Sequence, residues 1–569
     1  MKGSPFDLIT SSSEVKYSPR AFTTSSSVAR PTEMSSFGNI VLTARSNPSA
    51  LRNYTSNSQP TPTSSQKPKR NVKYDYNTRP ENSTKTSNEH VNYKIVTAND
   101  LENYKEPPRC VKMLVRDYIE DALYNPNYGY FPKQAIVFAG LGEEIDFNKI
   151  RNGDEFQEIV AKRYEEYGQD DAEGPGRQIF HTPTELFRPH YGHAIAQCII
   201  SEYLLKYFPY EDLNLYEIGA GNGSLAMDIL NFIRDRHPEV YERTRYTIIE
   251  ISGSLAEKQR QYLNSVHNCV EVVHKSIFRW KTTEPSPCFI VMMEVIDNFA
   301  HDMVRYDMKT LEPFQTFVSI DEEGDFYAHY TRITDPLISA FFSMRNALGH
   351  APPLPALLRS SSRIREIYSG LPFAPNLSQP EFIPTRLLSL IATLRTYFPR
   401  HRLILSDFAT LPDTIPGHNA PVVQTRLKNT MVPCQSLFVR QGYFDIFFPT
   451  NFEQLRDMYE HILARPSPNP GNGKTAAELP LPPPARSTPL WHSVSPLALG
   501  AEFFSSHPQN RRSPLDGVVS ASGLPVGEHK SSVFTHAEFM ETYADVERTR
   551  LRNGENPILD YYKNVKFLF

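Results

Sequence analysis

Cysteine, tryptophan and long apolar runs are scarce in this sequence of 569 residues. The five cysteines lie far apart and no pair has the C-x-x-C spacing of zinc ligands, so we expect neither a disulfide framework nor a metal site. No run of about 18 apolar residues occurs, so we expect no transmembrane helix and no stable membrane insertion. Hydrophobic residues still make up 40% of the chain, which is enough for a large buried core.

Lysine and arginine are in excess only near the N-terminus. Residues 1–80 hold 11 Lys and Arg against 4 Asp and Glu, a local charge of +7. The whole chain carries a formal charge of −4, which leaves −11 for the other residues. Because phosphate binding depends on Lys and Arg, so acidic a body argues against a nucleic-acid partner.

The N-terminal region, residues 1–95, is predicted to be disordered, because Ser, Thr, Arg, Asn and Pro prevail there without an apolar periodicity. Segments rich in Arg and Ser and poor in acids are typical of mitochondrial transit peptides. Residues 20–25 (RAFTTS) fit a presequence cleavage pattern. We therefore predict a mitochondrial location, with the matrix as the expected compartment. A low-complexity tail that is not cleaved is the alternative.

The rest of the chain divides by its hydrophobic patterning. Residues 96–210 are predicted to form a helical cap with a polar insertion at 142–178. Residues 211–465 alternate strands and helices, which predicts an α/β core with inserted loops. A Pro-rich stretch, residues 466–530, is predicted as a disordered loop. Residues 531–569 are predicted to add a helix and a strand that complete the core.

Three local patterns give further predictions. Apolar residues at helical spacing predict a helix over residues 111–124. Alternating residues over 314–332 predict antiparallel strands. Residues 435–448 predict a hairpin that turns at Gly442.

A glycine-rich turn follows a short apolar strand, residues 213–218. Gly219, Gly221 and Gly223 would let the backbone approach a ligand lying across the carboxyl end of that strand. A dinucleotide site has the spacing G-x-G-x-x-G, whereas here the third glycine comes one residue early. The spacing G-x-G-x-G after an acid, Glu217, is the form of S-adenosylmethionine-dependent methyltransferases. A turn without a ligand and a nicotinamide-dependent oxidoreductase are the alternatives.

A second acid, Glu250, ends the next predicted strand. Its carboxylate could accept hydrogen bonds from both ribose hydroxyls of an adenosine. In the alternative, Glu250 caps the following helix near Ser252 and Ser254. A third strand, residues 270–276, would bring its end close to the adenine.

The fourth predicted strand, residues 289–293, is an unbroken apolar run, which is typical of a strand buried on both faces. It places Glu294 and Asp297 at the same edge of the sheet. Carboxylates beside a methyl donor could orient a guanidinium group, which pairs with them bidentately. In the alternative, the two acids cap the next helix or pair with Arg305.

Several segments together resemble one family. Residues 118–131 (YIEDALYNPNYGYF) are similar to Y-x-x-x-A-L-Y-x-P-x-Y-G-Y-Y, 180–186 (FHTPTEL) to F-x-T-S-P-E-L, 217–225 (EIGAGNGSL) to E-L-G-P-G-R-G-T-L and 294–297 (EVID) to E-F-F-D, and residues 445–452 are similar to D-L-T-A-D-V-D-F. Over residues 110–465 and the C-terminus the chain resembles the MidA (DUF185) family of class I methyltransferases. Asn222 stands where the family has Arg, and Met293 where it has Asn.

The resemblance implies a Rossmann-like fold with a mostly parallel seven-stranded sheet, a helical N-terminal part and S-adenosyl-L-methionine as cofactor. The expected catalytic residues are Glu294, Asp297 and Glu185, and the expected cofactor-binding residues are Glu217, Gly219, Gly221, Asn222, Gly223 and Glu250. The implied function is protein arginine methylation, a symmetric dimethylation of a respiratory complex subunit during complex I assembly. The alternative is a catalytically inactive methyltransferase-like assembly or interaction protein.

Overall fold

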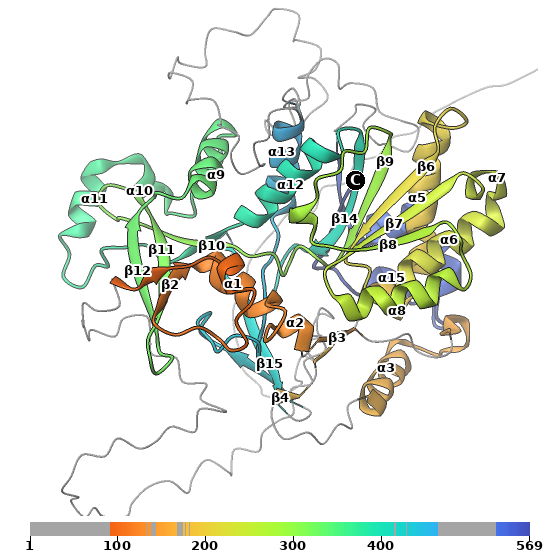
Figure 1. The fold of residues 1–569 in the computed structure, drawn as a ribbon, viewed down its shortest axis with the longest axis horizontal. Coiled ribbons are helices and arrows are strands. Elements are labelled where there is room, and N and C mark those ends of the chain that lie inside the picture. The colour runs from red at the N-terminus through yellow and green to blue at the C-terminus, as the bar shows by residue number, and fades with distance from the viewer. Residues whose placement is uncertain are drawn as a thin grey trace, which may run out of the picture. The chain divides into compact units, whose positions relative to one another are not determined.

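The computed structural model (Figure 1) describes residues 92–133, 135–137, 144–167, 175–176, 178–180, 182–412, 414, 417–427, 430–464 and 531–569. All of them belong to one unit, residues 37–569. Most of the N-terminal region predicted to be disordered, the Pro-rich stretch 466–530 and parts of the insertion at 142–178 lie outside the described residues.

A seven-stranded sheet brings together segments from both halves of the chain. Its strands, in spatial order, are β18 (Val533–Thr535), β19 (Val565–Leu568), β14 (His401–Phe408), β9 (Cys288–Met293), β6 (Leu213–Ile218), β7 (Thr244–Glu250) and β8 (Val270–His274). The five strands from β14 to β8 pair in parallel, and β19 is antiparallel to both of its neighbours. The predicted α/β class is confirmed.

The strand order reverses direction at the centre of this sheet. From β6 the chain moves outward through β7 to β8, then returns to place β9 on the other side of β6. In open α/β sheets, ligands bind outside the carboxyl ends of the strands at such a switch point. The loops after β6 and β9 are therefore where a ligand site is expected.

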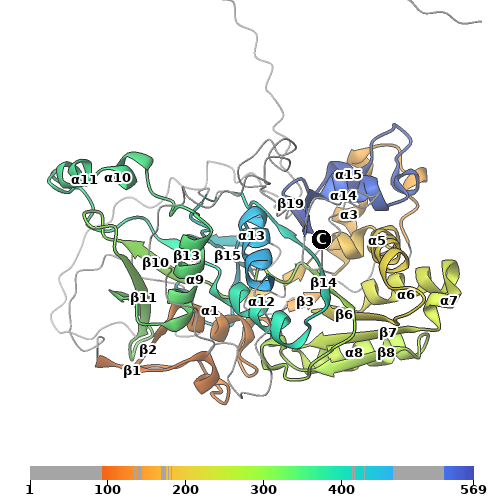
Figure 2. The same cartoon turned by 90° about the horizontal axis from the view of Figure 1, so that it is seen from above.

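Helices cover both faces of the seven-stranded sheet (Figure 2). They are α5 (His190–Lys206), α6 (Ser224–Arg236), α7 (Pro238–Tyr241), α8 (Gly253–Asn264), α12 (Thr385–Tyr397), α13 (Phe452–Leu463), α14 (His536–Tyr543) and α15 (Pro557–Asp560). Strand β9 shows why its apolar run is continuous. Phe289 and Val291 belong to the core that contains α5, α6 and α14, whereas Ile290 and Met292 belong to the core with α12 and α13.

A second sheet has six strands and contains both parallel and antiparallel pairs. Its strands are β1 (Lys94–Ile95), β2 (Val111–Leu114), β11 (Pro313–Ile320), β10 (Asp302–Tyr306) and β13 (Glu381–Ile383), with β12 (Phe326–Arg332) paired to β11. Among the described residues there are also two smaller sheets. One contains β16 (Thr430–Cys434), β15 (Val422–Leu427), β17 (Asp445–Phe447) and β4 (Pro175–Gly176), and the other contains β3 (Ala135–Val137) and β5 (Gln178–Phe180). The antiparallel strands predicted over 314–332 are confirmed by β11 and β12.

The remaining helices belong to the N-terminal part and to a segment between β12 and β13. They are α1 (Val115–Tyr124), α2 (Tyr130–Lys133), α3 (Gly153–Tyr167), α4 (Pro183–Leu186), α9 (Pro336–Ala347), α10 (Ala356–Ser360) and α11 (Ser362–Ser369). Several begin at a side chain that accepts a backbone N–H, as Asp335 does from Ile338 and Ser361 from Ile364. Among the described helices, none combines the length and apolar character needed to span a membrane.

Two local predictions were wrong. The helix predicted over 111–124 begins only at Val115, because residues 111–114 pair with β11 as strand β2. The N-terminal part is therefore not purely helical. The hairpin predicted over 435–448 does not form, since β17 pairs instead with β15, which precedes it in the chain. In both cases a tertiary partner decides the backbone conformation over local periodicity.

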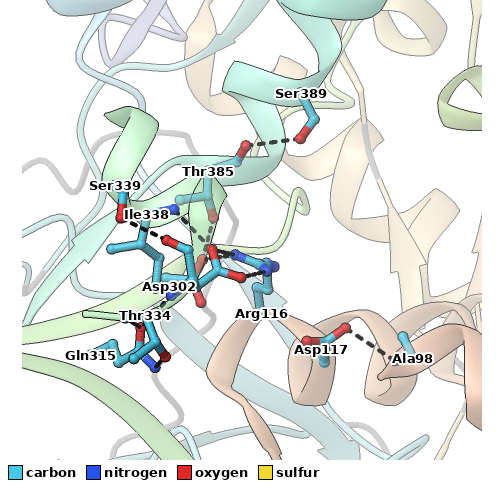
Figure 3. A network of polar contacts seen from close by, with 11 residues as sticks. Ala98, Arg116, Asp117, Asp302, Gln315, Thr334, Ile338, Ser339, Thr385 and Ser389 are labelled. Atoms are coloured by element: carbon cyan, nitrogen blue, oxygen red, sulfur yellow. Dashed lines mark hydrogen bonds and ion pairs between the residues drawn. The ribbon is translucent and has the colours of Figure 1, made fainter. Parts of the chain in front are cut away.

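A buried polar network joins the N-terminal part to the second sheet (Figure 3). Arg116 on α1 donates to Oδ2 of Asp302 on β10 at 2.7 Å and to both carboxylate oxygens of Asp335, which caps α9. Thr385, at the start of α12, donates to the same oxygen of Asp302 at 2.7 Å. The guanidinium group thus joins α1, β10 and α9, and Asp302 extends the network to α12.

The two chain ends that border residues 465–530 lie together. Helix α13 ends at Leu463, and the backbone N–H of Ser531 donates to Oε1 of Glu460 on that helix at 3.1 Å. Strand β18 begins two residues later and joins the seven-stranded sheet.

Candidate functional site

The glycine loop after β6 adopts a conformation that only glycine takes without strain. The φ angles of Gly219, Gly221 and Gly223 are 74°, 56° and 81°. A Cβ atom on Gly219 would lie 3.0 Å from Cγ2 of Val295, and one on Gly223 would lie 3.1 Å from Cδ1 of Leu263. The loop therefore needs small residues for its own packing as well as for a ligand.

The first predicted acid, Glu217, is buried at the end of β6. Its Oε2 accepts a hydrogen bond from the hydroxyl of Tyr246 on β7 at 2.8 Å. Burial raises the pKa of Glu217 to about 7, with a smaller contribution from the charge of Glu250 and against the lowering effect of the Tyr246 hydroxyl. The side chain is thus held beneath the loop by its neighbour strand.

The second predicted acid, Glu250, is adjacent to the glycine loop. The side-chain amide of Gln259 on α8 donates to the carbonyl oxygen of Gly221 at 2.7 Å and to Oε2 of Glu250 at 3.0 Å. The other oxygen of Glu250 accepts the backbone N–H of Ser252 at 2.8 Å, the local contact that the capping alternative predicts. Burial raises the pKa of Glu250. Each carboxylate oxygen still has a lone pair for a ligand hydroxyl.

Asn222 in the loop contacts the N-terminal part of the chain. Its side-chain amide donates to Oε1 of Glu185 at 3.3 Å. Glu185 lies in α4, where its backbone N–H donates to the hydroxyl of Thr182. The other carboxylate oxygen, Oε2, is buried without a hydrogen-bond partner among the described residues. Burial raises the pKa of Glu185.

Glu294 follows β9 in a strained backbone conformation. Its φ is 55°, a left-handed value that is unusual for a residue with a side chain. The backbone is fixed by a hydrogen bond from its N–H to the carbonyl of Ser406 on β14, at 2.9 Å. The Oε1 atom is buried and has no partner among the described residues. Burial, with the nearby charges of Asp407 and Glu185, raises the pKa of Glu294 well above its ordinary value.

Asp407, which lies near the end of β14, shapes the turn after Glu294. Its Oδ2 accepts the backbone N–H groups of Ile296 at 2.9 Å and Asp297 at 3.1 Å. Burial raises the pKa of Asp407 to about 7. The pKa of Asp297 lies well above its ordinary value, first because of burial and then because of Asp407 and Asp445. Oδ1 of Asp297 is buried without a partner in the described part of the chain.

The N-terminal segment that includes α1 and α2 covers this turn. Asn298 donates from its side chain to Oδ1 of Asp445 at 3.0 Å, and its carbonyl accepts the hydroxyl of Tyr124 at 3.2 Å. Tyr124 stacks on Phe131 with ring centroids 5.3 Å apart. Aromatic side chains thus lie against a turn that carries acids.

The two halves of the site are contiguous. Val295, between the two predicted catalytic acids, is the side chain that a Cβ on Gly219 would strike. The structure therefore places the turn of Glu294 and Asp297 next to the glycine loop, as the shared sheet edge predicts, and Glu185 reaches the loop through its hydrogen bond with Asn222. The surroundings fit an adenosyl ligand: glycines leave room, Glu250 offers an acceptor, and acids line the adjoining turn. Among the described residues, no group of three or more His, Cys, Asp and Glu could hold a metal ion.

The sequence analysis missed three polar residues of this site. Asp407 follows the apolar residues 403–405 near the end of the parallel strand β14, so its place at the same sheet edge could have been found from the alternation of strands and helices. Gln259 lies one helix beyond Glu250, and Asp445 follows no strand of the seven-stranded sheet. Nothing in the local sequence marks Gln259, whereas Asp445 begins the segment 445–452 that resembles a family motif, although no role was predicted for it.

Parts of this chain are similar to known methyltransferases. A sequence model of the family described as S-adenosyl-L-methionine-dependent methyltransferase matches residues 194–468. The mitochondrial "protein arginine methyltransferase NDUFAF7 homolog" of Schizosaccharomyces pombe is 25% identical over 337 residues, which are 55% of this chain and 67% of that protein. The protein of the same name from Saccharomyces cerevisiae is 22% identical over 297 residues, 48% of this chain and 66% of that protein.

Among solved structures, a COG1565 superfamily member from Burkholderia thailandensis bound to S-adenosyl-homocysteine is 14% identical, with a TM-score of 0.37; the match covers 63% of this chain and 73% of that one. The family match contains β6, β7 and β9 with the loops that follow them. It thus includes both halves of the site described above. The matched part of the chain, residues 194–468, is similar to the MidA-like family of S-adenosyl-L-methionine-dependent methyltransferases.

Proposed function

We propose that this protein transfers a methyl group from S-adenosylmethionine to an arginine side chain of a protein. The observation that carries the proposal is the pair Glu294 and Asp297, each with a buried carboxylate oxygen that has no partner among the described residues, next to the glycine loop. Buried polar atoms without partners cost about 1–3 kcal/mol each. A guanidinium group offers five N–H donors in a planar fork, which would satisfy both acids.

The raised pKa values of these acids fit a cationic substrate. Without a partner the buried carboxyls hold protons, because burial penalises the charged form. An arriving guanidinium would favour the charged form of Glu294 and Asp297. Binding of the substrate should therefore release protons to the solvent.

The residues of this chain would place the nucleophile and hold a proton. S-adenosylmethionine, held at the glycine loop, would supply an electrophilic methyl group for the guanidinium nitrogen, and its sulfur would retain the electron pair. Transfer depends mainly on an in-line arrangement, which Glu294 and Asp297 would impose on the substrate. The nitrogen loses one proton in the step, and Glu294, which the bound guanidinium keeps as a carboxylate, would accept it.

We assign the cofactor to the loop of Gly219, Gly221 and Gly223, with its ribose at Glu250. Asn222 and Glu217 would support this loop from either side. The order of the seven strands, with one antiparallel strand next to the edge, supports the assignment of the fold to the Rossmann-like class I methyltransferases. We also propose the domain boundaries predicted from the sequence, at residues 96, 211, 466 and 531.

The proposed setting is the mitochondrial matrix. The two fungal relatives carry "mitochondrial" and "protein arginine methyltransferase" in their names. The local charge of +7 over residues 1–80 is that of an import signal. The family resemblance supports a respiratory complex subunit as substrate and symmetric dimethylation as product.

Methyl transfer from labelled S-adenosylmethionine to a mitochondrial protein extract would test the proposal. Glu294→Gln and Asp297→Asn should each lower transfer at least about a hundredfold and leave the cofactor Kd within about twofold. Glu271→Gln, at an exposed position on β8, is the matched control and should transfer at the wild-type rate. Undiminished transfer by Glu294→Gln would rule out the proposed role of this acid.

An inactive assembly protein is the second candidate. The observation in its favour is Asn222, which occupies the place of the family's Arg and is bonded to Glu185. Such a protein would bind its partner without transferring label in the same experiment. Mass spectrometry of mitochondrial proteins from cells with and without this gene separates the two candidates. If the protein is an active enzyme, an arginine dimethylation should be missing from the cells that lack the gene.

A further inference from the structure

An apolar helix face points into solvent on the segment between α9 and β13. Five large apolar side chains of this segment are exposed, with relative exposures of 69% for Leu357, 36% for Ile364, 69% for Ile367, 53% for Leu371 and 103% for Phe373. Exposed apolar residues scattered singly need no explanation, but a contiguous group marks an interaction surface. We call residues 356–374 the α10–α11 arm.

The spacing of these residues is that of an amphipathic helix. Ile364 and Ile367 lie at positions i and i+3 of α11, which puts them in one stripe on the helix, and Leu371 follows just beyond the helix end at Ser369. None of the residues of α11 is buried. The stripe therefore faces solvent, whereas a helix of this pattern ordinarily packs its apolar side against a core.

The arm is held firmly at its base. Arg365 donates from Nε to the carbonyl of Lys309 at 3.0 Å and from Nη1 to the carbonyl of Leu358 at 2.8 Å. After the arm, the backbone N–H of Ser378 donates to the carbonyl of Tyr306 on β10 at 2.8 Å. The apolar stripe is thus displayed by an anchored element and is not a frayed end.

Phe373 at the end of the arm is displayed at a cost. Its φ of 67° lies in the left-handed region, which disfavours a residue with a bulky side chain. Such strain is kept where the surroundings over-determine it, commonly at functional positions. The strained turn presents the aromatic ring entirely to solvent.

Positive charge borders the stripe. The arm contains Arg359, Arg363 and Arg365 and a single acid, Glu366, so its net charge is +2. The residues beyond position 80 together carry −11, so the arm stands out from an acidic body. Two such arms would repel each other, which disfavours a second copy of this chain as the occupant. The complementary surface is apolar and anionic.

We propose that the α10–α11 arm binds the surface of an anionic lipid bilayer. A helix that lies in a membrane interface has apolar residues on one side and Arg or Lys on its flank, as here. The arm exposes five large apolar side chains, which suit a deformable apolar layer. In Figures 1 and 2, α10 and α11 lie on the side of β11 and β12, away from β8, so contact there leaves the loops after β6 and β9 clear of the bilayer.

Co-sedimentation of the full chain with lipid vesicles tests this proposal. One set of vesicles is phosphatidylcholine alone and the other is phosphatidylcholine mixed with phosphatidylglycerol. We expect binding to the mixed vesicles only, with an affinity that falls as salt screens the arginines. Arg363→Glu should weaken binding roughly tenfold or more, given roughly fivefold per basic residue at such a surface. The double variant Ile367→Glu/Phe373→Glu should abolish it.

The matched control is Leu205→Glu. Leu205 is 66% exposed, close to the value for Ile367, but lies at the end of α5. The Leu205→Glu variant should bind the mixed vesicles as the wild type does. All variants should keep the wild-type Tm and cofactor affinity. The proposal is overturned if the wild type does not prefer the mixed vesicles, or if Leu205→Glu loses as much binding as the arm variants. Self-association that Ile367→Glu/Phe373→Glu abolishes, without vesicle binding, would also overturn it in favour of a second copy.

Discussion

Asn222 and Glu185, which are 37 residues apart in the chain, are joined by a hydrogen bond of 3.3 Å from the amide of one to the carboxyl of the other. The bond couples the loop that is proposed to hold the cofactor to the segment that is proposed to border the substrate. A change at either residue should therefore be felt at both. The amide is a neutral donor, so it leaves the pKa of Glu185 raised by burial.

Replacing Asn222 with Asp should weaken cofactor binding about tenfold, a loss of about 1.4 kcal/mol. The new carboxylate would face Glu185 at hydrogen-bond distance, and two carboxylates there repel each other. Isothermal titration with S-adenosylmethionine measures the change. Asn222→Ala, which removes the donor without adding charge, should lose less. Equal affinities for the wild type and Asn222→Asp would contradict the coupling.

Gln259→Leu should also reduce cofactor affinity about tenfold. The substitution removes the donor shared by the carbonyl of Gly221 and the carboxylate of Glu250, so the loop and the acid lose their common anchor. Gln261→Leu on the same helix is the control, because Gln261 is exposed and its side chain donates to Glu257, away from the loop. If the two variants bind S-adenosylmethionine equally well, Gln259 does not organise the site.

The cofactor-free protein should lose stability relative to Glu217→Gln as pH rises from about 4 to 8. The pKa of Glu217 is raised to about 7 in the folded state, so between its unfolded value and 7 the folded state holds a proton that the unfolded state has released. The difference in free energy of unfolding should reach at most about 3 kcal/mol. Urea unfolding of both proteins at several pH values measures it. Buried histidines such as His301 and His536 titrate in the opposite sense but equally in both proteins.

A constant difference across that range would show that Glu217 does not titrate differently in the two states. The side-chain amide introduced by Glu217→Gln can still accept the hydroxyl of Tyr246 through its carbonyl oxygen, so the comparison isolates the charge.

Arg116→Ala should lower the free energy of unfolding by about 3–5 kcal/mol, because it leaves the buried carboxylates of Asp302 and Asp335 without their cation. Thermal unfolding of the full chain measures the loss. Arg550→Ala removes an exposed pair with Glu547 and should change stability by less than about 0.5 kcal/mol. Similar effects of the two variants would mean that the network in Figure 3 adds nothing to stability.

Patterns within a single strand or loop were sufficient to predict much of this site. The unbroken run 289–293 predicted a strand buried on both faces, and the spacing of Gly219, Gly221 and Gly223 predicted the turn that joins β6 to α6. Parallel strands end at one edge, so Glu250 and Glu294 could be placed together from the sequence alone.

Long-range pairing set the limit of prediction. Residues 111–114 have helical spacing but become a strand because β11, some 200 residues away, supplies the partner. The same holds for Asp407, whose role depends on backbone N–H groups of Ile296 and Asp297 on a different strand's loop. Such contacts leave no local periodicity to detect.

The hydrogen bond between Ser531 and Glu460 has a consequence for how this protein tolerates change in length. The chain leaves α13 and returns to β18 at nearly the same point, so the connection between them is a closed loop. The entropic cost of closing a loop grows only with the logarithm of its length. A doubling of that connection would cost about 0.6 kcal/mol. Evolution could therefore lengthen or trim this stretch, and an engineer could replace it with a short linker, while the sheet and its methyl-transfer site stay in place.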